Sequence, residues 1–571
     1  MTNWVERRSK KQATELEAYP ALVQRLLLNR DIATREQAEQ FLHPDYTRDS
    51  VDPYLIQDMA KAVERIVLAI SKREKIVIFG DYDADGIPGA TTLYLLFRAL
   101  DYPLASVYIP DRYSEKYGLS DQSLRKFHAD GATVVITVDC GITDVDEAIV
   151  ARELGIDLII TDHHIVPITI PTAYAVLNIK RPDDTSPFKH YCGAGMAWKL
   201  AQGIIRHKKV NSGINGLELE KSLLDLVAIS TICDMVPLVG ENRVIVREGL
   251  LRMARHTRVG LKALFAKAKL KPLHITEDDI AFMVGPRINI SSRMAHGSDT
   301  FYLLSTDDAL LANSIATELE VRNKVRRGSV QVIMDSVTEL LDIKTLPEMI
   351  VVGDNAWRIG VLGLTANRLM EKYSRPVCVW TLNHEGHIKG SIRSDGSVLV
   401  NELFSALGGD DFFINHGGHE LAGGFSLTAT LKDEFEQRLA LEYQKLRKAP
   451  TLSKLKYDTE LKVSDIGWKL YGEIESLAPF GKGNDKPIFL IKNVSILSVT
   501  EFGKDHVHAE LLLGDEGRQI PMIAFFKSLQ DFSHLDLATG QNVDVLVNIE
   551  KSVFKGYPEL RLRLVDIRQT T

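Results

Sequence analysis

A run of four apolar residues, Ile76–Phe79, leads through one glycine into three acids spaced two apart, Asp81, Asp83 and Asp85. An apolar run without alternation is typical of a strand that is buried on both faces, as in a parallel sheet. The residues that follow, from Gly86 to Leu100, have the apolar content of a helix. We therefore expect the acids at the carboxyl end of a strand, where open α/β sheets bind their ligands. Three carboxylates this close repel one another unless a cation lies among them, so the stretch predicts a metal site; the alternative is a solvated acidic turn.

Three later segments have the same form, an apolar run that ends at an acid or a histidine. The runs are 134–138, 158–161 and 226–232, and the polar residues near their ends are Asp139, Asp162, His163, His164 and Asp234. We interpret all three runs as strands of the same sheet, whose ends converge on a single place. Asp and His ligands without thiolates suit hard or borderline divalent ions, such as Mn²⁺ and Mg²⁺.

These motifs together resemble those of the DHH phosphoesterases. They are Asp81–Gly86, Val138–Asp139, Asp162–His164 and Cys233–Leu238. Within that superfamily the chain is most similar to the RecJ single-strand DNA exonucleases of bacteria, over nearly its whole length. The resemblance implies two divalent metal ions, Mn²⁺ preferred or Mg²⁺, held by Asp81, Asp83, Asp85, Asp139, His163 and Asp234. It also implies a catalytic group of Asp139, Asp162, His163 and His164, in which Asp139 is the candidate to bridge the ions. His164 is expected to reach phosphate oxygens, and Asp162 is expected to orient its neighbours.

The same resemblance implies a set of substrate-binding residues in four further segments. Two segments belong to the first domain, residues 110–119 and residues 285–294, which we interpret as loops. The other two, residues 389–394 and 415–424, belong to the second domain, where a glycine-rich loop and an arginine fork would form a phosphate cradle. The expected substrate-binding residues are Arg112, Tyr117, Arg287, Asn289, Arg293, Ser391, Arg393, Gly417, Gly418 and His419.

The chain of 571 residues is too long for a single core, and its pattern predicts an α/β protein with an additional all-β domain. We expect a parallel-sheet DHH domain, a smaller α/β DHH-associated domain joined to it by a long helix, and a C-terminal OB-fold. The expected boundaries are 1–70 for an N-terminal helical arm, 71–305 for the DHH domain, 306–344 for the connecting helix, 345–447 for the DHH-associated domain and 455–571 for the OB-fold.

The last domain is predicted to be all-β because its apolar residues alternate with polar ones in short segments. Five such strands are typical of an OB-fold, which often binds single-stranded nucleic acid. Its candidate stacking residues are Phe525, Phe526, Phe554 and Tyr557. Core packing is the alternative role for each of these aromatic residues.

Composition and charge restrict the compartment and the possible ligands of the protein. The sequence has no run of eighteen apolar residues and no apolar core of a signal peptide at its start, so we expect a cytoplasmic protein without a membrane span. Four scattered cysteines fit a reducing compartment and exclude a cysteine zinc site. The net charge of −7 neither supports nor forbids DNA as a ligand, because part of it belongs to the expected metal site.

The resulting hypothesis is a single-stranded-DNA-specific 5′→3′ exonuclease that releases 5′-mononucleotides by two-metal hydrolysis and acts in DNA repair and recombination. Two alternatives stay open: a DHH phosphodiesterase for short oligoribonucleotides or cyclic dinucleotides, and a non-catalytic RecJ-like DNA-binding scaffold. The expected partner is single-stranded DNA with a 5′-phosphate end. A single-stranded-DNA-binding protein and a RecQ-type helicase are further candidate partners, and we expect a monomer.

Overall fold

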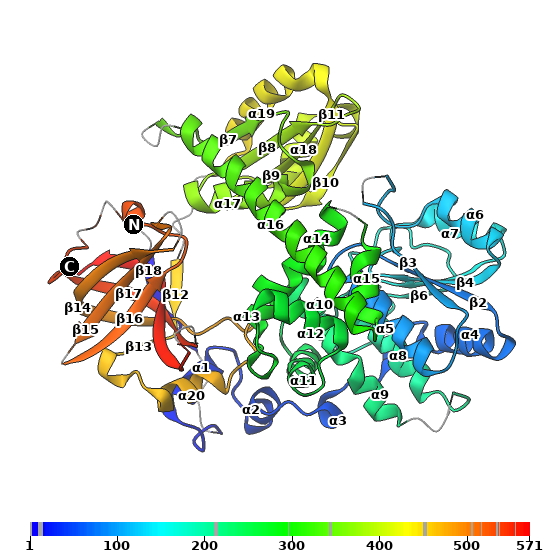
Figure 1. Ribbon diagram of the computed structural model, residues 1–571, viewed down its shortest axis with the longest axis horizontal. Helices are drawn as coiled ribbons and strands as arrows, with labels where there is room; N and C mark the ends of the chain where they lie inside the picture. Colours follow the sequence, from blue (N-terminus) through cyan, green and yellow to red (C-terminus); the bar gives the residue numbers. More distant parts are fainter. Residues whose placement is uncertain are drawn as a thin grey trace.

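The computed structural model describes residues 3–9, 15–112, 114–210, 215–294, 296–341, 345–448, 454–503, 506–515, 517–532, 535, 537–553 and 556–570. Figure 1 shows three bodies: a large sheet with helices in blue to green, a smaller sheet with helices in yellow-green, and a barrel in orange to red. The long helix α16 (Ala309–Leu340) runs from the first body to the second, as the sequence predicts. Among the described residues, no helix is both long and apolar enough to span a membrane.

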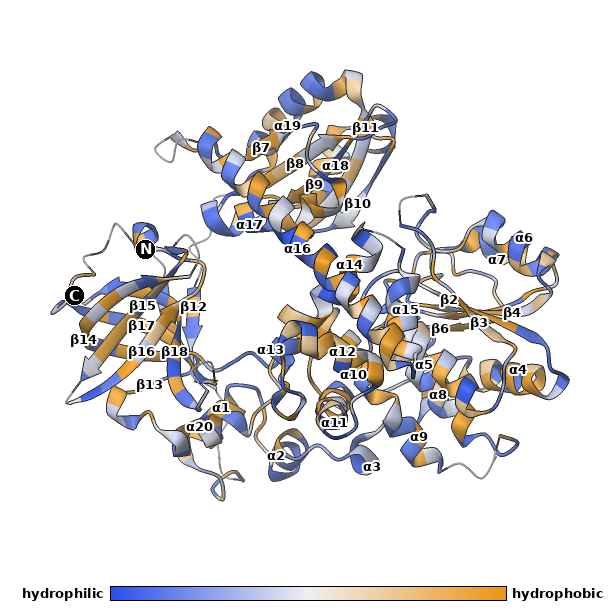
Figure 2. Ribbon diagram, viewed as in Figure 1, coloured by the Kyte–Doolittle hydropathy of each residue, from blue (hydrophilic) through white to orange (hydrophobic). Residues whose placement is uncertain are grey.

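The first body is built on a five-stranded sheet in the order β3-β2-β4-β5-β6, in which every neighbouring pair is parallel. The strands are β2 (Lys75–Gly80), β3 (Ala105–Tyr108), β4 (Ala132–Val138), β5 (Asp157–Thr161) and β6 (Ala175–Leu177). Figure 2 shows the central strands mainly in orange, because their side chains are apolar on both faces. The predicted parallel sheet is confirmed.

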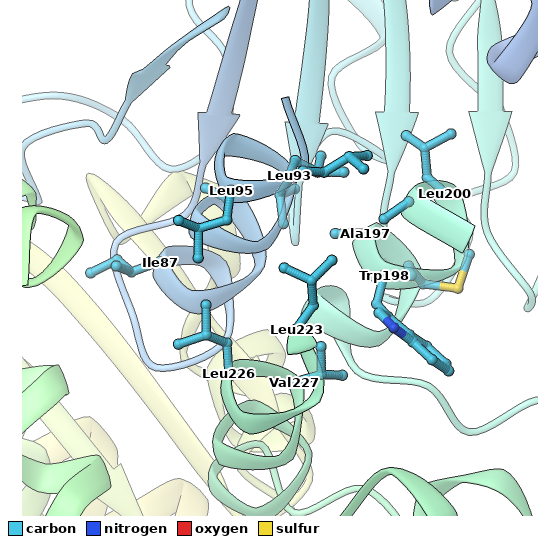
Figure 3. Close-up of a cluster of buried hydrophobic side chains, with 14 of the residues drawn as sticks. Ile87, Leu93, Leu95, Ala197, Trp198, Leu200, Leu223, Leu226 and Val227 are labelled. Atoms are coloured by element: carbon cyan, nitrogen blue, oxygen red, sulfur yellow. The ribbon is translucent and has the colours of Figure 1, made fainter. Parts of the chain in front are cut away.

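The predicted strand over residues 226–232 is wrong, because this segment forms helix α10 (Leu224–Cys233). Every residue from Leu224 to Ile232 is buried, so the apolar run has no polar face whose period would distinguish a helix from a strand. The helix packs against α5 (Gly86–Ala99) and α8 (Gly193–Arg206). Figure 3 shows this contact, where Leu226 and Val227 lie among side chains of the other two helices.

Most of the remaining helices of this body cover the sheet or follow it. They are α6 (Asp121–Ala129), α7 (Val145–Glu153), α9 (Gly216–Ser222), α11 (Glu241–Arg255), α12 (Val259–Ala268), η2 (Pro272–His274), α13 (Glu277–Asp279), η3 (Ile280–Val284), α14 (Gly285–Met294) and α15 (Ser298–Ser305). The segment 285–294, predicted to be a loop, is therefore helix α14. It packs against α16, and Ser292 stands in a regular helix that needs no glycine.

The N-terminal arm is helical from Ala21 onwards. Its helices are α1 (Ala21–Leu28), α2 (Arg35–Leu42), α3 (Tyr46–Asp49), η1 (Pro53–Leu55) and α4 (Met59–Lys72). The arm begins, however, with a strand, β1 (Asn3–Glu6), which pairs in parallel with β12 (Lys454–Tyr457). The indole of Trp4 donates to Asp566 at 2.8 Å, so the start of the chain is tied to the barrel.

The second body contains a five-stranded mixed sheet in the order β10-β11-β9-β8-β7. Its elements are β7 (Ile350–Gly353), η5 (Ile359–Val361), α17 (Leu362–Tyr373), β8 (Val377–Leu382), β9 (His387–Arg393), α18 (Val400–Leu407), η6 (Gly409–Asp411), β10 (Asn415–His419), β11 (Ala422–Thr428), η7 (Ala429–Leu431) and α19 (Lys432–Leu446). The glycine-rich segment 415–424, predicted to be a loop, is the hairpin formed by β10 and β11.

The third body is a closed five-stranded barrel. Its elements are β13 (Thr459–Glu460), η8 (Val463–Asp465), α20 (Trp468–Glu475), β14 (Phe489–Phe502), β15 (His508–Asp515), β16 (Arg518–Ala524), η10 (Leu529–Phe532), β17 (Asn542–Ser552) and β18 (Glu559–Gln569). The strands follow the order β14-β15-β16-β18-β17, and β14 closes the barrel by pairing with β17. This is the predicted OB-fold.

A buried arginine joins the barrel's leading segment to the first body. Arg243 of α11 is 1% exposed, and its guanidinium donates to the carbonyl oxygens of Phe41, Leu477, Ala478 and Pro479 at 2.9–3.2 Å. Burial, together with repulsion from Arg30 and Arg247, lowers the pKa of Arg243 to about 9. Asn484 adds two further bonds, to the carbonyl oxygens of Leu477 and Pro479.

We predict that Arg243→Ala destabilises the protein by about 3 kcal/mol, because the carbonyls of Phe41 and Ala478 lose their bonds from Arg243 and each buried carbonyl left without a donor costs about 1–3 kcal/mol. Thermal and urea unfolding measure the loss. Arg247→Ala is the matched control on the same helix, since Arg247 donates to a single carbonyl, that of Leu42. Equal unfolding midpoints for the two variants would contradict the role given to Arg243.

Candidate metal centre

The acidic turn after β2 is shaped by hydrogen bonds to its own backbone. Asp83 accepts from the N–H groups of Asp85 and Gly86 at 2.8 and 3.1 Å, at the start of α5. Asn289 of α14 accepts from the N–H of Ala84 at 2.8 Å. The turn therefore holds its carboxylates in place through bonds from two directions.

The N-terminus of α8 contacts two of the carboxylates. Asp85 accepts from the N–H groups of Gly193 and Ala194 at 2.6 and 2.7 Å, a favourable position for a negative charge. A Cβ on Gly193 would lie 2.4 Å from the Cβ of Asp139, so only glycine allows this approach. Asp139 itself has φ of +65°, in the left-handed region, which turns the chain sharply at the end of β4.

His163 lies at the middle of the cluster. Its Nε2 is 3.2 Å from Asp139 Oδ1, 3.7 Å from Asp85 Oδ2 and 3.7 Å from Asp234 Oδ2. Burial, together with repulsion from His164, lowers the pKa of His163 to about 3. The ring is therefore neutral and offers a lone pair, which is the form of histidine that binds metals.

Asp162 lies behind the two histidines rather than among the facing carboxylates. It accepts from the N–H of Ile142 at 3.0 Å, from the N–H of His163 at 2.7 Å and from the ring Nδ1 of His164 at 2.8 Å. Burial acts to raise its pKa, but these bonds outweigh burial and lower the pKa overall. These bonds hold both histidines, and the orienting role of Asp162 stays a prediction.

The unpaired atoms of the cluster fit a cation. Asp81 Oδ1, Asp139 Oδ1 and His163 Nε2 are buried without a hydrogen-bond partner, which is costly unless a ligand satisfies them. Burial and repulsion from Asp83 raise the pKa of Asp85 to about 6, and burial and repulsion from Asp85 raise that of Asp139. Three overlapping groups of side chains could each surround one ion: Asp85, His163 and Asp234; Asp81, Asp83 and Asp139; and Asp139, His163 and His164.

A pocket of about 310 Å³ opens over the cluster. Predicted substrate-binding residues line it, namely Arg112, Tyr117, Asn289 and Arg293. The Tyr117 hydroxyl donates to the carbonyl of Asp139 at 3.0 Å, and Arg112 lies 5.0 Å from the ring of Tyr82. Tyr82 also lines the pocket and is missing from the predicted substrate-binding residues. Its position in the sequence between Asp81 and Asp83 was the signal that could have identified it.

Arg287 takes a different position from the predicted one. Its side chain is buried and bonds to Glu320 of α16 at 2.7–2.8 Å and to the carbonyl of Met283 at 2.6 Å. It does not line the pocket. The structure therefore gives Arg287 a helix-joining contact in place of the expected phosphate contact.

The predicted residues of the second body lie outside the lining of this pocket. They are Ser391, Arg393, Gly417, Gly418 and His419, on β9 and β10. Arg393 donates to the Ser391 hydroxyl at 2.9 Å and to the carbonyl of Ile392 at 2.8 Å, and among the described residues no carboxylate pairs with it. The two bodies meet beside the pocket, where Arg293 donates to the carbonyl of Gly360 at 3.4 Å.

Three segments of the chain match known families. Residues 75–231 match the DHH family N-terminal domain, residues 346–445 the DHHA1 domain and residues 457–566 the RecJ OB domain. Fold and site thus define a phosphoesterase of the DHH class, a metal-dependent hydrolase.

Whole-chain comparisons narrow this class. The chain is 32% identical to the single-stranded-DNA-specific exonuclease RecJ of Dickeya dadantii over 448 residues, 76% of this chain and 77% of that protein. It is 35% identical to RecJ of Bacillus subtilis over 520 residues, 90% of this chain and 64% of that longer protein. A crystal structure of RecJ with Mn²⁺ from Thermus thermophilus superposes with a TM-score of 0.82 at 25% identity, covering 100% of this chain and 80% of that one. The chain belongs to the RecJ family.

We predict that Asp139→Asn removes Mn²⁺ binding and also raises the unfolding temperature of the metal-free protein. The reason is that one of several mutually repelling carboxylates becomes neutral, while a residue common to two of the three ligand groups loses its charge. Calorimetric titration with Mn²⁺ and thermal unfolding in a chelator measure the two effects. The matched control is Asp146→Asn, an acid in the first turn of α7. Retention of two Mn²⁺ ions by Asp139→Asn would contradict the assignment.

Proposed function

We propose that this protein is a single-stranded-DNA-specific 5′→3′ exonuclease that releases 5′-mononucleotides. The observation that supports this most strongly is the set of three buried, unpaired atoms, two of which belong to residues that line a pocket together with Arg112 and Arg293. The site fits two divalent ions, Mn²⁺ preferred or Mg²⁺. One would be held by Asp85, His163 and Asp234 and the other by Asp81, Asp83 and Asp139. Bound there, they would supply Lewis-acid activation of water and of the scissile phosphate.

The remaining residues of the pocket position the strand. Arg112 and Arg293 supply positive charge for phosphate oxygens, and Tyr117 supplies a wall beside Asp139. Asp162 holds Nδ1 of His164, which leaves Nε2 as the ring nitrogen for a phosphate oxygen. Asn289 acts on the acidic turn, because its amide oxygen holds the N–H of Ala84.

A fixed direction of degradation needs a feature that occurs at one end of the DNA strand only, and a terminal 5′-phosphate is such a feature. Arg393 is a suitable partner because it is partly buried and, among the described residues, its guanidinium bonds only to neutral oxygens. Ser391 lies beside it on β9, and Gly417, Gly418 and His419 lie on the edge strand β10, which is separated from β9 by β11. We place the 5′-phosphate in this cradle, with the first linkage over the metal centre.

The cellular compartment, the biological process and the partners are part of the same proposal. We propose a cytoplasmic monomer that acts in DNA repair and recombination; the four described cysteines are free thiols, as a reducing compartment favours. A pocket that takes one strand requires duplexes to be opened, so a RecQ-type helicase and a single-stranded-DNA-binding protein are the partners we propose. We also propose domain boundaries at 1–70, 71–305, 306–344, 345–447 and 455–571.

The cradle predicts a preference for 5′-phosphate over 5′-hydroxyl ends. Arg393→Ala should lower this preference roughly tenfold or more, because a bond to a charged group contributes about 1.5–3 kcal/mol. Matched single strands, labelled at either end, measure rate and direction. Arg438→Ala is the control in the same body, since Arg438 pairs with Glu434. Equal rates on both ends, or loss of the 3′ label first, would refute the proposal.

The barrel is predicted to contribute binding affinity for long strands and not to take part in hydrolysis. Phe526 is 76% exposed beside His508 at 5.0 Å, and Tyr557 is 58% exposed in the loop before β18; the fourth candidate, Phe554, lies outside the described residues. Phe526→Ala should weaken binding of long strands while hydrolysis of a trinucleotide keeps its rate. Trp468→Ala, an exposed aromatic of α20, is the control. A slowed trinucleotide reaction would show that the barrel belongs to the reaction site.

A further inference from the structure

A second cavity, of about 380 Å³, adjoins the metal pocket, and Asn289 and Arg293 line both. Its walls come from the end of α10, from η3, from α16 and α17, and from residues 480–482 that precede the barrel. Figure 1 places α13, which leads into η3, between the barrel and α10. A strand that leaves the metal pocket toward the barrel would therefore enter this cavity.

Two apolar side chains in this cavity are exposed by unusual backbone. Phe282 is 66% exposed and belongs to η3, a π-helix, a rare form that is frequent at functional sites. Met235 is 65% exposed and has φ of +57°, in the left-handed region that is unfavourable for residues other than glycine. Folding alone would favour burial of both side chains. A flat aromatic ring and a thioether are instead suited to contact a planar ring.

The charge of the cavity is complementary to a phosphate. Arg326 of α16 lines it; its Nε is buried without a partner, and among the described residues no carboxylate forms an ion pair with it. The acids in the lining are engaged elsewhere, since Glu277 accepts from the N–H of Phe480 at 3.0 Å and Asp278 pairs with Lys486. Arg326 does donate from Nη2 to Asn323 at 2.9 Å, so the cavity combines an apolar wall with a cation whose Nε has no partner.

We propose that this cavity is a downstream slot, which holds the nucleotide beyond the scissile linkage with its base against Phe282 and Met235 and its phosphate near Arg326. The proposal rests on the proposed function, because it takes a single strand as the ligand. Stacking on an aromatic ring accepts every base, so the slot adds affinity without sequence preference. The slot should bind an abasic residue more weakly than a nucleotide with a base, because an abasic residue has no ring to stack.

The first test measures binding of single strands in Ca²⁺, with a gel to show that the strands stay intact. Phe282→Ala should bind roughly five- to 150-fold more weakly, the range for loss of one base–aromatic stack. Phe282→Tyr should restore binding. Leu273→Ala is the matched control, because Leu273 is 76% exposed in the neighbouring η2 and does not line the cavity.

The second test scans one abasic residue along the strand. The wild-type protein should lose affinity when the abasic residue is the second nucleotide from the 5′ end, and Phe282→Ala should show no further loss there. Arg326→Gln should lower the slope of log affinity against log salt by about 0.7, the share of one phosphate contact on a single strand. Arg327→Gln is the matched control and should leave the slope unchanged, because the Arg327 side chain already pairs with Glu320.

The outcomes separate this inference from the proposed function. If Phe282→Ala binds as tightly as Leu273→Ala, or if abasic residues at all positions act alike, the slot is refuted even where the wild-type protein degrades strands from the 5′ end. If the position dependence is found but Mn²⁺ supports no degradation by the wild-type protein, the slot stands and the nuclease proposal fails.

Discussion

The mutual repulsion of buried carboxylates is the constraint on which the rest of this structure depends. Asp81, Asp85 and Asp139 are each at most 5% exposed, and they meet where strands β2 and β4 end. Such a cluster persists only because many elements hold it: α8 donates two N–H groups to Asp85, and Asn289 holds the acidic turn from α14. A site of this kind is stable with cations and strained without them.

The strands could be predicted because their burial leaves a simple signature, an apolar run followed by a polar residue. The same signature failed for residues 226–232, since α10 is buried on all sides and has no polar face. The strand β1 gave no signal because its partner, β12, lies about 450 residues later in the chain. Segment 285–294 forms helix α14 and not the predicted loop; its glycine and proline stand at the start of this helix, where proline is tolerated.

Some residues of the candidate site could also be located from the sequence, and others could not. Asp162, His163 and His164 could be located from the sequence because they directly follow the buried strand β5, and their roles stay predictions. Arg287 could not, because its partner Glu320 lies on another helix and the pairing is a matter of packing. The downstream slot was also hidden, since it depends on a π-helix and on a junction of several separate segments. Sequence periodicity contains no information on either.

The direct test of the central claim, that repelling carboxylates are balanced by two cations, is anomalous diffraction from a crystal of this protein soaked in Mn²⁺. The account predicts two peaks, one among Asp85, His163 and Asp234 and one among Asp81, Asp83 and Asp139. A single peak, or peaks away from these residues, would contradict it.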